Sequence, residues 1–268
     1  MTAGAGRRHA TITVGGIAVG LHTSDDAFLR TLKDRYAGFI GSQEAADYEF
    51  DVDLTPPAGT SPDDDVHVFR NGRQWMLERG DFRAEWDPVA RRGRIRQSAN
   101  PYSLDTVLRI VHTLVLAGEG GFLVHASSAV RNGRAFLFAG VSGAGKTTIS
   151  RLAPPDAHVL TDEISYVRKE AGGYFAYGTP FAGDLARPGE NLRAPLAALY
   201  LLAQGPENRI DAISTADAAR GLLSCILFFA KDAALVQAVF QSALDFVERV
   251  PVRRLTFVPD SRVWKMIR

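Results

Sequence analysis

The chain is short of cysteine, with Cys225 as its single thiol in 268 residues. One thiol excludes a disulfide framework within the chain. The six histidines are scattered without the spacing of metal ligands, so a structural zinc site is not expected either. Cys225 lies in the apolar run LLSCILFFA, which is typical of a small buried hydrophobe. A reducing, cytoplasmic setting follows as the expectation.

Net charge and long apolar runs are also lacking. The formal charge is +1, so no overall field favours nucleic acid or an anionic membrane surface as a partner. No apolar run is long enough to cross a bilayer, and the N-terminus has no apolar core of a signal peptide. A hydrophobic content of 46% and a charged content of 23% are ordinary for a packed globular chain of one large or two modest domains.

The first hundred residues alternate between apolar and polar positions in short segments. Gly15-Gly16 and Asn71-Gly72 each separate two such segments, which indicates hairpins. One helical pattern, SDDAFLRTLKDRYAGFI, interrupts them. We therefore predict a small antiparallel β-rich α+β domain over residues 1–100, followed by a second domain over 101–268.

The run ARRGRIRQ places four arginines within residues 91–96. One interpretation is a docking site for an acidic peptide or a phosphate. The other, which we favour, is a solvated strand whose arginines pair with the acidic side of YEFDVDL, because short charge runs usually lie on the surface.

A phosphate-binding loop stands near the middle of the chain. Residues 140–147 read GVSGAGKT, the G-x4-G-K-[ST] pattern, between a buried strand (RAFLFA) and a short helix. Glycines let successive backbone N–H groups turn toward an anion at a helix N-terminus, the lysine adds a point charge, and the threonine hydroxyl can ligate Mg²⁺. We predict that ATP, or another nucleoside triphosphate, is bound by Gly140, Ser142, Gly143, Ala144, Gly145, Lys146, Thr147 and Thr148.

A second acidic element follows the loop in AHVLTDEISYV. Asp162 and Glu163 come at the end of a predicted strand, the place of the acid that meets the magnesium in P-loop enzymes. We expect Thr147 and Asp162 to hold Mg²⁺. We expect Glu163 to orient an acceptor hydroxyl and take its proton.

The strand before the loop is the second arm of a hairpin, FLVHASSAV-RNGR-AFLFAG. A two-residue turn at Asn132-Gly133 fixes the register. Continued without a bulge, that register sets His125 opposite Gly140. A lone histidine in an apolar strand is usually a core residue, but this position makes His125 a candidate catalytic residue.

These segments carry a resemblance. LVHASSAVRNGRAFLFAGVSGAGKTTISRL followed by LTDE resembles the catalytic core of the HPr kinase/phosphorylase family, over roughly residues 122–167. That family phosphorylates a serine of a carrier protein and shares its fold with phosphoenolpyruvate carboxykinases. GTPFAGD and APLAALYLLAQGPENRI resemble stand-alone HPr-kinase-related proteins, some from lasso peptide gene clusters, where they phosphorylate the precursor peptide. The resemblance implies an α/β fold with a P-loop core and a mixed sheet, and it matches the family's catalytic and metal positions to His125, Lys146, Thr147, Asp162 and Glu163.

The chain also departs from the bifunctional members. They carry Asp-Asp where this chain has Asp162-Glu163, and Ser-Glu where it has Thr147-Thr148. Their downstream phosphorylase signature and C-terminal docking segment are not evident here. The expected function is thus an ATP-dependent serine kinase acting on a peptide or protein. The alternatives are a kinase for a small molecule such as free serine, a P-loop ATPase without an acceptor, and a non-catalytic nucleotide-binding module; the sequence leaves homo-oligomers open.

Overall fold

The computed structural model describes residues 8–41, 45–57, 65–185 and 188–268. Their contacts form two compact units. The first runs to His112 and includes Phe229–Asp232, and the second comprises Thr113–Phe228 and Ala233–Arg268. The division falls inside helix α2 (Pro101–Glu119). The sequence-based boundary after residue 100 stays a prediction.

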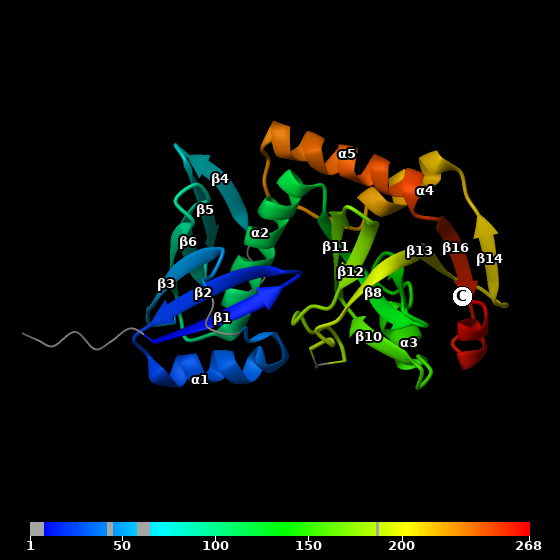
Figure 1. Ribbon diagram of the computed structural model, residues 1–268, viewed down its shortest axis with the longest axis horizontal. Coiled ribbons are helices and arrows are strands. Elements are labelled where there is room, and N and C mark those ends of the chain that lie inside the picture. Colours follow the sequence, from blue (N-terminus) through cyan, green and yellow to red (C-terminus); the bar gives the residue numbers. More distant parts are fainter. Residues whose placement is uncertain (1–7, 42–44, 58–64, 186–187) are drawn as a thin grey trace, which may run out of the picture. The chain divides into compact units, whose positions relative to one another are not determined.

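The first unit contains a seven-stranded sheet in the order β1-β2-β3-β7-β6-β5-β4. Figure 1 shows its strands β1 to β6. Helix α1 (Asp26–Arg35) and the short 3-10 helix η1 (Ala37–Phe39) connect β2 to β3. Asp25 caps α1, because its carboxylate accepts a hydrogen bond from the Phe28 N–H. The strands are β1 (Arg8–Val14), β2 (Ile17–Thr23), β3 (Tyr48–Leu54), β4 (His67–Asn71), β5 (Gln74–Arg79), β6 (Phe82–Asp87) and β7 (Arg92–Gln97).

The prediction of an antiparallel sheet here is wrong, since β3 runs parallel to both of its neighbours, β2 and β7. The helical segment between β2 and β3 is the reason. A helix that connects two neighbouring strands carries the chain back to the end of the sheet where it started, so the second strand runs parallel to the first. The remaining pairs, β1 with β2 and the meander β4 to β7, are antiparallel as expected. The sheet is therefore mixed.

The arginine-rich run forms β7, and its partner is the acidic strand β3. Asp53 and Arg94 make an ion pair of 3.3 Å across these strands. The register places an acid opposite each arginine: Glu49 opposite Arg92, Asp51 opposite Arg94 and Asp53 opposite Arg96. This pairing supports the interpretation of the run as a charged strand whose arginines pair with the acidic residues of β3.

The second unit contains a nine-stranded mixed sheet in which two long strands serve several neighbours. β8 pairs with β9, β10, β11 and β15, and β13 pairs with β9, β12 and β16. The pairings β8-β9-β13-β12-β11-β8 close a circuit. The strands are β8 (Phe122–Arg131), β9 (Arg134–Ala139), β10 (Ala157–Thr161), β11 (Ile164–Glu170), β12 (Gly173–Tyr177), β13 (Arg193–Gln204), β14 (Arg209–Ala212), β15 (Ile226–Leu227) and β16 (Val252–Phe257).

Two hydrophobic clusters lie in this unit. One contains Leu222 from α4 (Thr215–Leu223) and Phe246 from α5 (Ala233–Arg249), packed on side chains of β8, β9 and β11 to β13. The other contains Ile149 from α3 (Lys146–Arg151) and Trp264 from η2 (Ser261–Lys265), packed on β9, β13 and β16. Among the described residues, no helix has both the length and the apolarity required to span a bilayer.

The β8–β9 hairpin has the predicted turn. Asn132 and Gly133 both have positive φ, 52° and 72°, as a tight two-residue hairpin turn requires. The predicted register holds from the pair Arg131–Arg134 to the pair Ala126–Ala139, where the ladder ends. The expected pair of His125 with Gly140 does not form. The chain leaves β9 at that point to enter the glycine-rich loop.

Candidate active site

The glycine-rich loop connects β9 to α3. Gly143 and Gly145 have φ of 78° and 109°, the left-handed region that glycine adopts without strain. A side chain at Gly145 would also place its Cβ 2.6 Å from the ring of Phe257. Close packing and backbone conformation therefore both require glycine here. A turn of this kind can direct successive N–H groups toward one anion.

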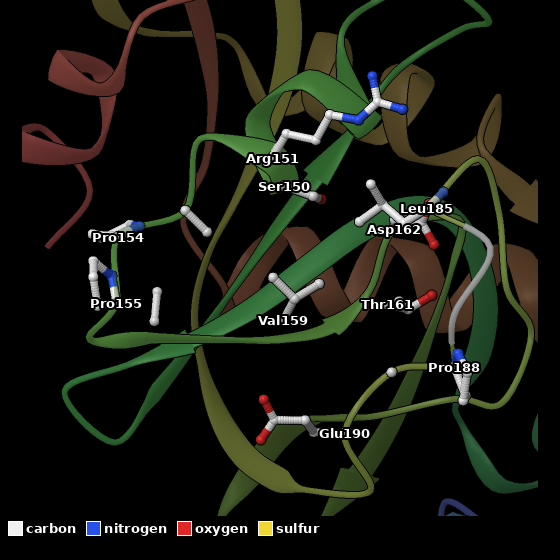
Figure 2. A pocket seen from close by; sticks show the side chains of 13 residues that line it. Ser150, Arg151, Pro154, Pro155, Val159, Thr161, Asp162, Leu185, Pro188 and Glu190 are labelled. Atoms are coloured by element: carbon white, nitrogen blue, oxygen red, sulfur yellow. The ribbon is translucent and has the colours of Figure 1, made fainter.

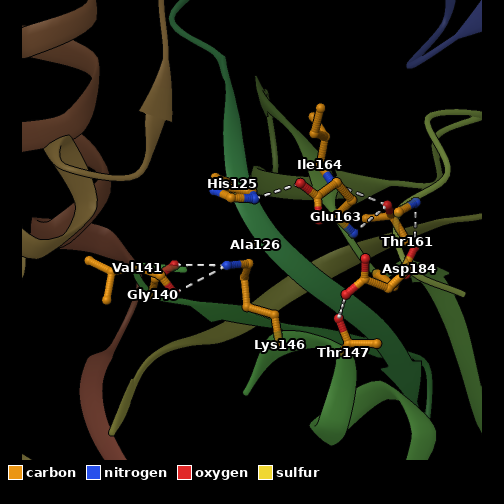
Figure 3. A network of polar contacts seen from close by, with 12 residues as sticks. His125, Ala126, Gly140, Val141, Lys146, Thr147, Thr161, Glu163, Ile164 and Asp184 are labelled. Atoms are coloured by element: carbon orange, nitrogen blue, oxygen red, sulfur yellow. Dashed lines mark hydrogen bonds and ion pairs between the residues drawn. The ribbon is translucent and has the colours of Figure 1, made fainter. Parts of the chain in front are cut away.

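Lys146 is the first residue of α3 and is a buried residue, with 7% of its surface exposed. Its ammonium group reaches back over the loop and donates hydrogen bonds to the carbonyl oxygens of Gly140, at 3.0 Å, and Val141, at 3.4 Å (Figure 3). A cation in a partly desolvated site interacts strongly with an anion brought beside it. The loop and the lysine thus give this end of the sheet the means to bind phosphate.

Thr147 lies next to Lys146 and faces a different segment of the chain. Its hydroxyl donates to a carboxylate oxygen of Asp184 at 3.3 Å (Figure 3). Asp184 belongs to the loop between β12 and β13 and is not among the predicted site residues. The oxygen atoms of Thr147 and Asp184 form a pair at the start of α3.

Asp162 lies in a bend between β10 and β11 and is 2% exposed. Both strands pair with β8. The register of β10 shifts by one residue between Val159 and Thr161, and after this shift Thr161 is opposite Ser128 and Ile164, in β11, is opposite His125. Each carboxylate oxygen of Asp162 accepts a backbone N–H. The donors are Gly183, at 3.1 Å, and Leu185, at 2.8 Å, on either side of Asp184.

Glu163, the next residue in the bend, contacts His125. The two atoms His125 Nε2 and Glu163 Oε1 are 2.7 Å apart, and both side chains are about one third exposed, at 38% and 33%. Because an ionised carboxylate only accepts, the ring N–H donates. The backbone N–H of His125 donates to the carbonyl of Cys225. His125 is thus placed at the site by β11, and not by the pair with Gly140 that the hairpin register predicts.

The remaining predicted residues surround the loop. Ser142 and Gly143 are exposed at its tip, Ala144 is buried beneath it, and Thr148 lies in the first turn of α3. Gln204 is a further residue that sequence reasoning missed. Its amide donates to the carbonyl of Gly143 at 2.7 Å.

Two cavities adjoin the loop and α3, each of about 480 Å³. One begins at Gly145 and Thr148 and is lined further by Gln204, Gly205, Phe257 and Pro259. The other, shown in Figure 2, extends from the C-terminal end of α3 past Asp162 to the segment 188–190. Arg151 and Glu190 give it charged groups of both signs.

In the described part of the chain, no group of three or more Asp, Glu, His or Cys side chains lies close enough together to hold a metal ion. Single oxygen ligands for a cation are nevertheless present. Candidate oxygen ligands are the hydroxyl of Thr147 and the carboxylates of Asp184 and Asp162. Mg²⁺ is usually bound through one or two carboxylates together with phosphates and waters. The donor set therefore fits that cation.

Comparison with known proteins adds a family. The family model described as "ScmC: SynChlorMet cassette protein ScmC" matches residues 97–268, which is more than half of the chain and includes the loop, the bend and Asp184. No curated protein matches significantly.

Proposed function

The chain belongs to the family of SynChlorMet cassette protein ScmC, and from its site we propose that it is an ATP-dependent kinase that phosphorylates a serine hydroxyl of a peptide or protein. The observation that carries the proposal is the arrangement around Lys146. A glycine-rich loop with a buried lysine stands beside a hydroxyl–carboxylate pair, Thr147 with Asp184, and a histidine–carboxylate pair, His125 with Glu163.

The nucleotide would bind with its phosphates against the loop. The N–H groups of residues 140–147 and the ammonium of Lys146 would meet the phosphate oxygens, with Lys146 exchanging its carbonyl partners for them. The cavity that begins at Gly145 and Thr148 would take the nucleoside, since it adjoins the start of α3 and offers the ring of Phe257 and the amide of Gln204.

Bound Mg²⁺ would neutralise charge on the phosphates. The chain's own part is to offer oxygen atoms at the start of α3. They come from the hydroxyl of Thr147 and from the carboxylates of Asp184 and Asp162. These residues also fix where the outer phosphate lies.

Glu163 would serve the acceptor. The acceptor's hydroxyl oxygen forms a bond to the γ-phosphorus, the bond from that phosphorus to the β–γ bridging oxygen breaks, and the hydroxyl proton passes to the Glu163 carboxylate as ADP leaves. His125 donates to one oxygen of that carboxylate and so holds its orientation toward the acceptor hydroxyl. Phosphoryl transfer depends mainly on positioning and charge, so this pair would contribute less than the loop and the lysine.

The finer fold assignment belongs to the same proposal. We infer a P-loop core of the HPr kinase and phosphoenolpyruvate carboxykinase type. Support comes from the sequence resemblance over residues 122–167 and from the antiparallel arm, β8, beside the strand that enters the loop. A stand-alone, peptide-directed kinase remains our preferred member of that group, because the phosphorylase signature is not evident in the sequence.

The test follows the γ-phosphate. Protein, Mg²⁺ and ATP labelled at the γ position are incubated with serine-bearing peptides, including candidate precursors encoded near the gene, and separately with free serine. We expect phosphoserine in a peptide, formed by the wild type and by Lys33→Ala, an exposed lysine changed as a control. Lys146→Ala should lose transfer by about a thousandfold, since one charge on the transferring phosphate is typically worth several kcal/mol.

Other outcomes identify the rivals. Label in free serine alone would make the protein a small-molecule kinase. Release of free phosphate at the same rate with and without every acceptor would make it an ATPase. Transfer by Lys146→Ala at the wild-type rate would exclude the loop as the phosphate site.

A further inference from the structure

Resting on the proposed nucleotide site, we propose that two residues divide the role that the sequence assigns to Asp162 alone. Asp162 is a positioning residue that fastens the loop 183–185. Asp184, carried by that loop, is the carboxylate that faces the magnesium and the phosphates beside Thr147.

The hydrogen bonds of Asp162 carry the first half of the proposal. Its carboxylate is almost fully buried, and each oxygen already accepts a backbone N–H, from Gly183 at one side and Leu185 at the other. A buried carboxylate needs such donors, because an unpaired charge away from water is costly. Asp162 is therefore occupied with the backbone of the loop.

Gly183 shows how closely this loop lies on the bend. A Cβ added at Gly183 would be 2.7 Å from the Cβ of Glu163 and 3.0 Å from a carboxylate oxygen of Asp162. Its φ lies outside the left-handed region, so the close approach of the two segments, and not the backbone conformation, is what a side chain would disturb. The loop is held by contact as well as by the two hydrogen bonds.

Asp184 is the residue between the two that Asp162 holds. Its side chain is exposed, and it accepts a hydrogen bond from Thr147, the residue after Lys146 whose hydroxyl the sequence predicts as a metal ligand. An exposed carboxylate beside that hydroxyl can give oxygen atoms to Mg²⁺ without first losing a backbone partner. Figure 3 shows Asp184 pointing at Thr147 from the opposite side of the site to Lys146.

The first measurement is nucleotide affinity with Mg²⁺ and with EDTA, using a fluorescent ATP analogue. We expect the wild type and Asp211→Asn, an aspartate of β14 changed as a control, to bind more tightly with Mg²⁺. Asp184→Asn should reduce that advantage by about 10- to 100-fold, the usual effect of a metal-site residue. Its affinity in EDTA should stay the same or rise, because a negative charge near the phosphates is gone.

The second measurement is hydrogen exchange at the Gly183 and Leu185 amides. Asp162→Asn should lose protection there, because an amide nitrogen replaces one acceptor oxygen, and should lose the Mg²⁺ advantage with it. Asp184→Asn should keep the protection. Gly183→Ala displaces the loop while it retains both carboxylates, so it should lose the same amide protection and the same Mg²⁺ advantage. It therefore provides the test if Asp162→Asn does not fold.

The results also separate this inference from the proposed function. If the wild type binds no nucleotide, the proposed function and the role of Asp184 both fall. If it binds with a Mg²⁺ advantage that Asp184→Asn retains in full, the proposed nucleotide site stands and the division is wrong. Loss of the advantage in Asp162→Asn with the two amides still protected would restore Asp162 as the direct ligand.

Discussion

At the residue scale, the contact between His125 and Glu163 has a counterpart elsewhere in the chain. His22 and Glu49, in the first unit, are 2.6 Å apart and exposed to a similar extent. The two pairs are alike in chemistry and differ in surroundings. Only the pair of His125 and Glu163 lies in the unit that contains the glycine-rich loop. Any special role of Glu163 must therefore come from its position.

That position gives a prediction. Glu163→Gln should leave the affinity for ATP unchanged and slow phosphate transfer by about a hundredfold, because the amide keeps the shape of the side chain and cannot take the acceptor's proton. The rate at saturating ATP and saturating acceptor is the measurement, with Glu49→Gln as the matched control that should transfer normally. Equal rates for the two variants would remove Glu163 from the chemistry.

Residues of the loop were open to prediction from sequence, and Asp184 was not. The glycine positions follow from local backbone conformation, which Gly143 and Gly145 show in their positive φ. The contact of Asp184 with Thr147 joins residues 37 apart and exists because Asp162 holds the intervening loop. No local pattern records such an arrangement. The segment GTPFAGD contains Asp184, but its spacing from the loop has no fixed meaning in the absence of the fold.

At the element scale, helix α5 is fastened to the sheet through one carboxylate. Asp245 of α5 accepts hydrogen bonds from Tyr174 of β12 at 2.7 Å and from Arg249 at 2.9 Å, and pairs with Lys169 of β11 at 2.9 Å. Burial by itself would raise the pKa of Asp245, but these three partners outweigh it and hold that pKa well below its usual range. Burial and the nearby carboxylate also raise the pKa of Tyr174, so its hydroxyl stays protonated and donates.

A carboxyl whose pKa is lower in the folded than in the unfolded state stabilises the fold above the unfolded pKa, and that contribution declines as the pH falls toward the folded pKa. Asp245→Asn should therefore lower the free energy of unfolding at pH 7, by about 1–2 kcal/mol for hydrogen bonds to a charged group that is partly exposed. The difference from the wild type should narrow below about pH 4, where the unfolded aspartate takes up its proton. Denaturant unfolding from pH 7 to pH 3 measures it, and a constant difference would contradict the assignment.

Strand pairing shows the same limits of sequence reasoning at this scale. The Asn132-Gly133 turn fixed the register of β8 with β9, since a two-residue loop leaves no freedom. The end of that ladder and the parallel partners of β3 depend on segments distant in sequence. The helix between β2 and β3 was a sequence signal for the parallel pair. The alternation of apolar and polar residues within the strands does not indicate whether neighbouring strands run parallel or antiparallel.

At the scale of the whole molecule, the residues of the proposed phosphate site lie in one of the two compact units. The loop, the bend and Asp184 all belong to the second unit. The sheet of the first unit presents charges that are matched across β3 and β7. We expect the first unit to contribute to recognition of the acceptor and to leave nucleotide binding unaffected.

Calorimetry with nucleotide tests this expectation. ATP and Mg²⁺ at about 100 times the Kd should add about 2.7 kcal/mol to the free energy of unfolding. For a domain of this size that corresponds to a rise in Tm of roughly 5–10 °C. Hydrogen exchange should slow in the second unit and stay unchanged in β1 to β7. The same rise in Lys146→Ala, or slower exchange confined to the first unit, would contradict the placement of the nucleotide.

The crowded surroundings of β8 have a consequence for the evolution of this chain. β8 has neighbours along both edges, so the loss or gain of one residue within it would turn the side chains on one side of the change to the opposite face and disturb the pairing that brings His125 to Glu163. The turn at its end is different, because a Cβ at Gly133 would meet nothing within 4 Å. Insertions can therefore accumulate at Asn132-Gly133 while β8 stays fixed in length, and the same turn is where an epitope tag or a reporter loop can be added to the protein without moving the site.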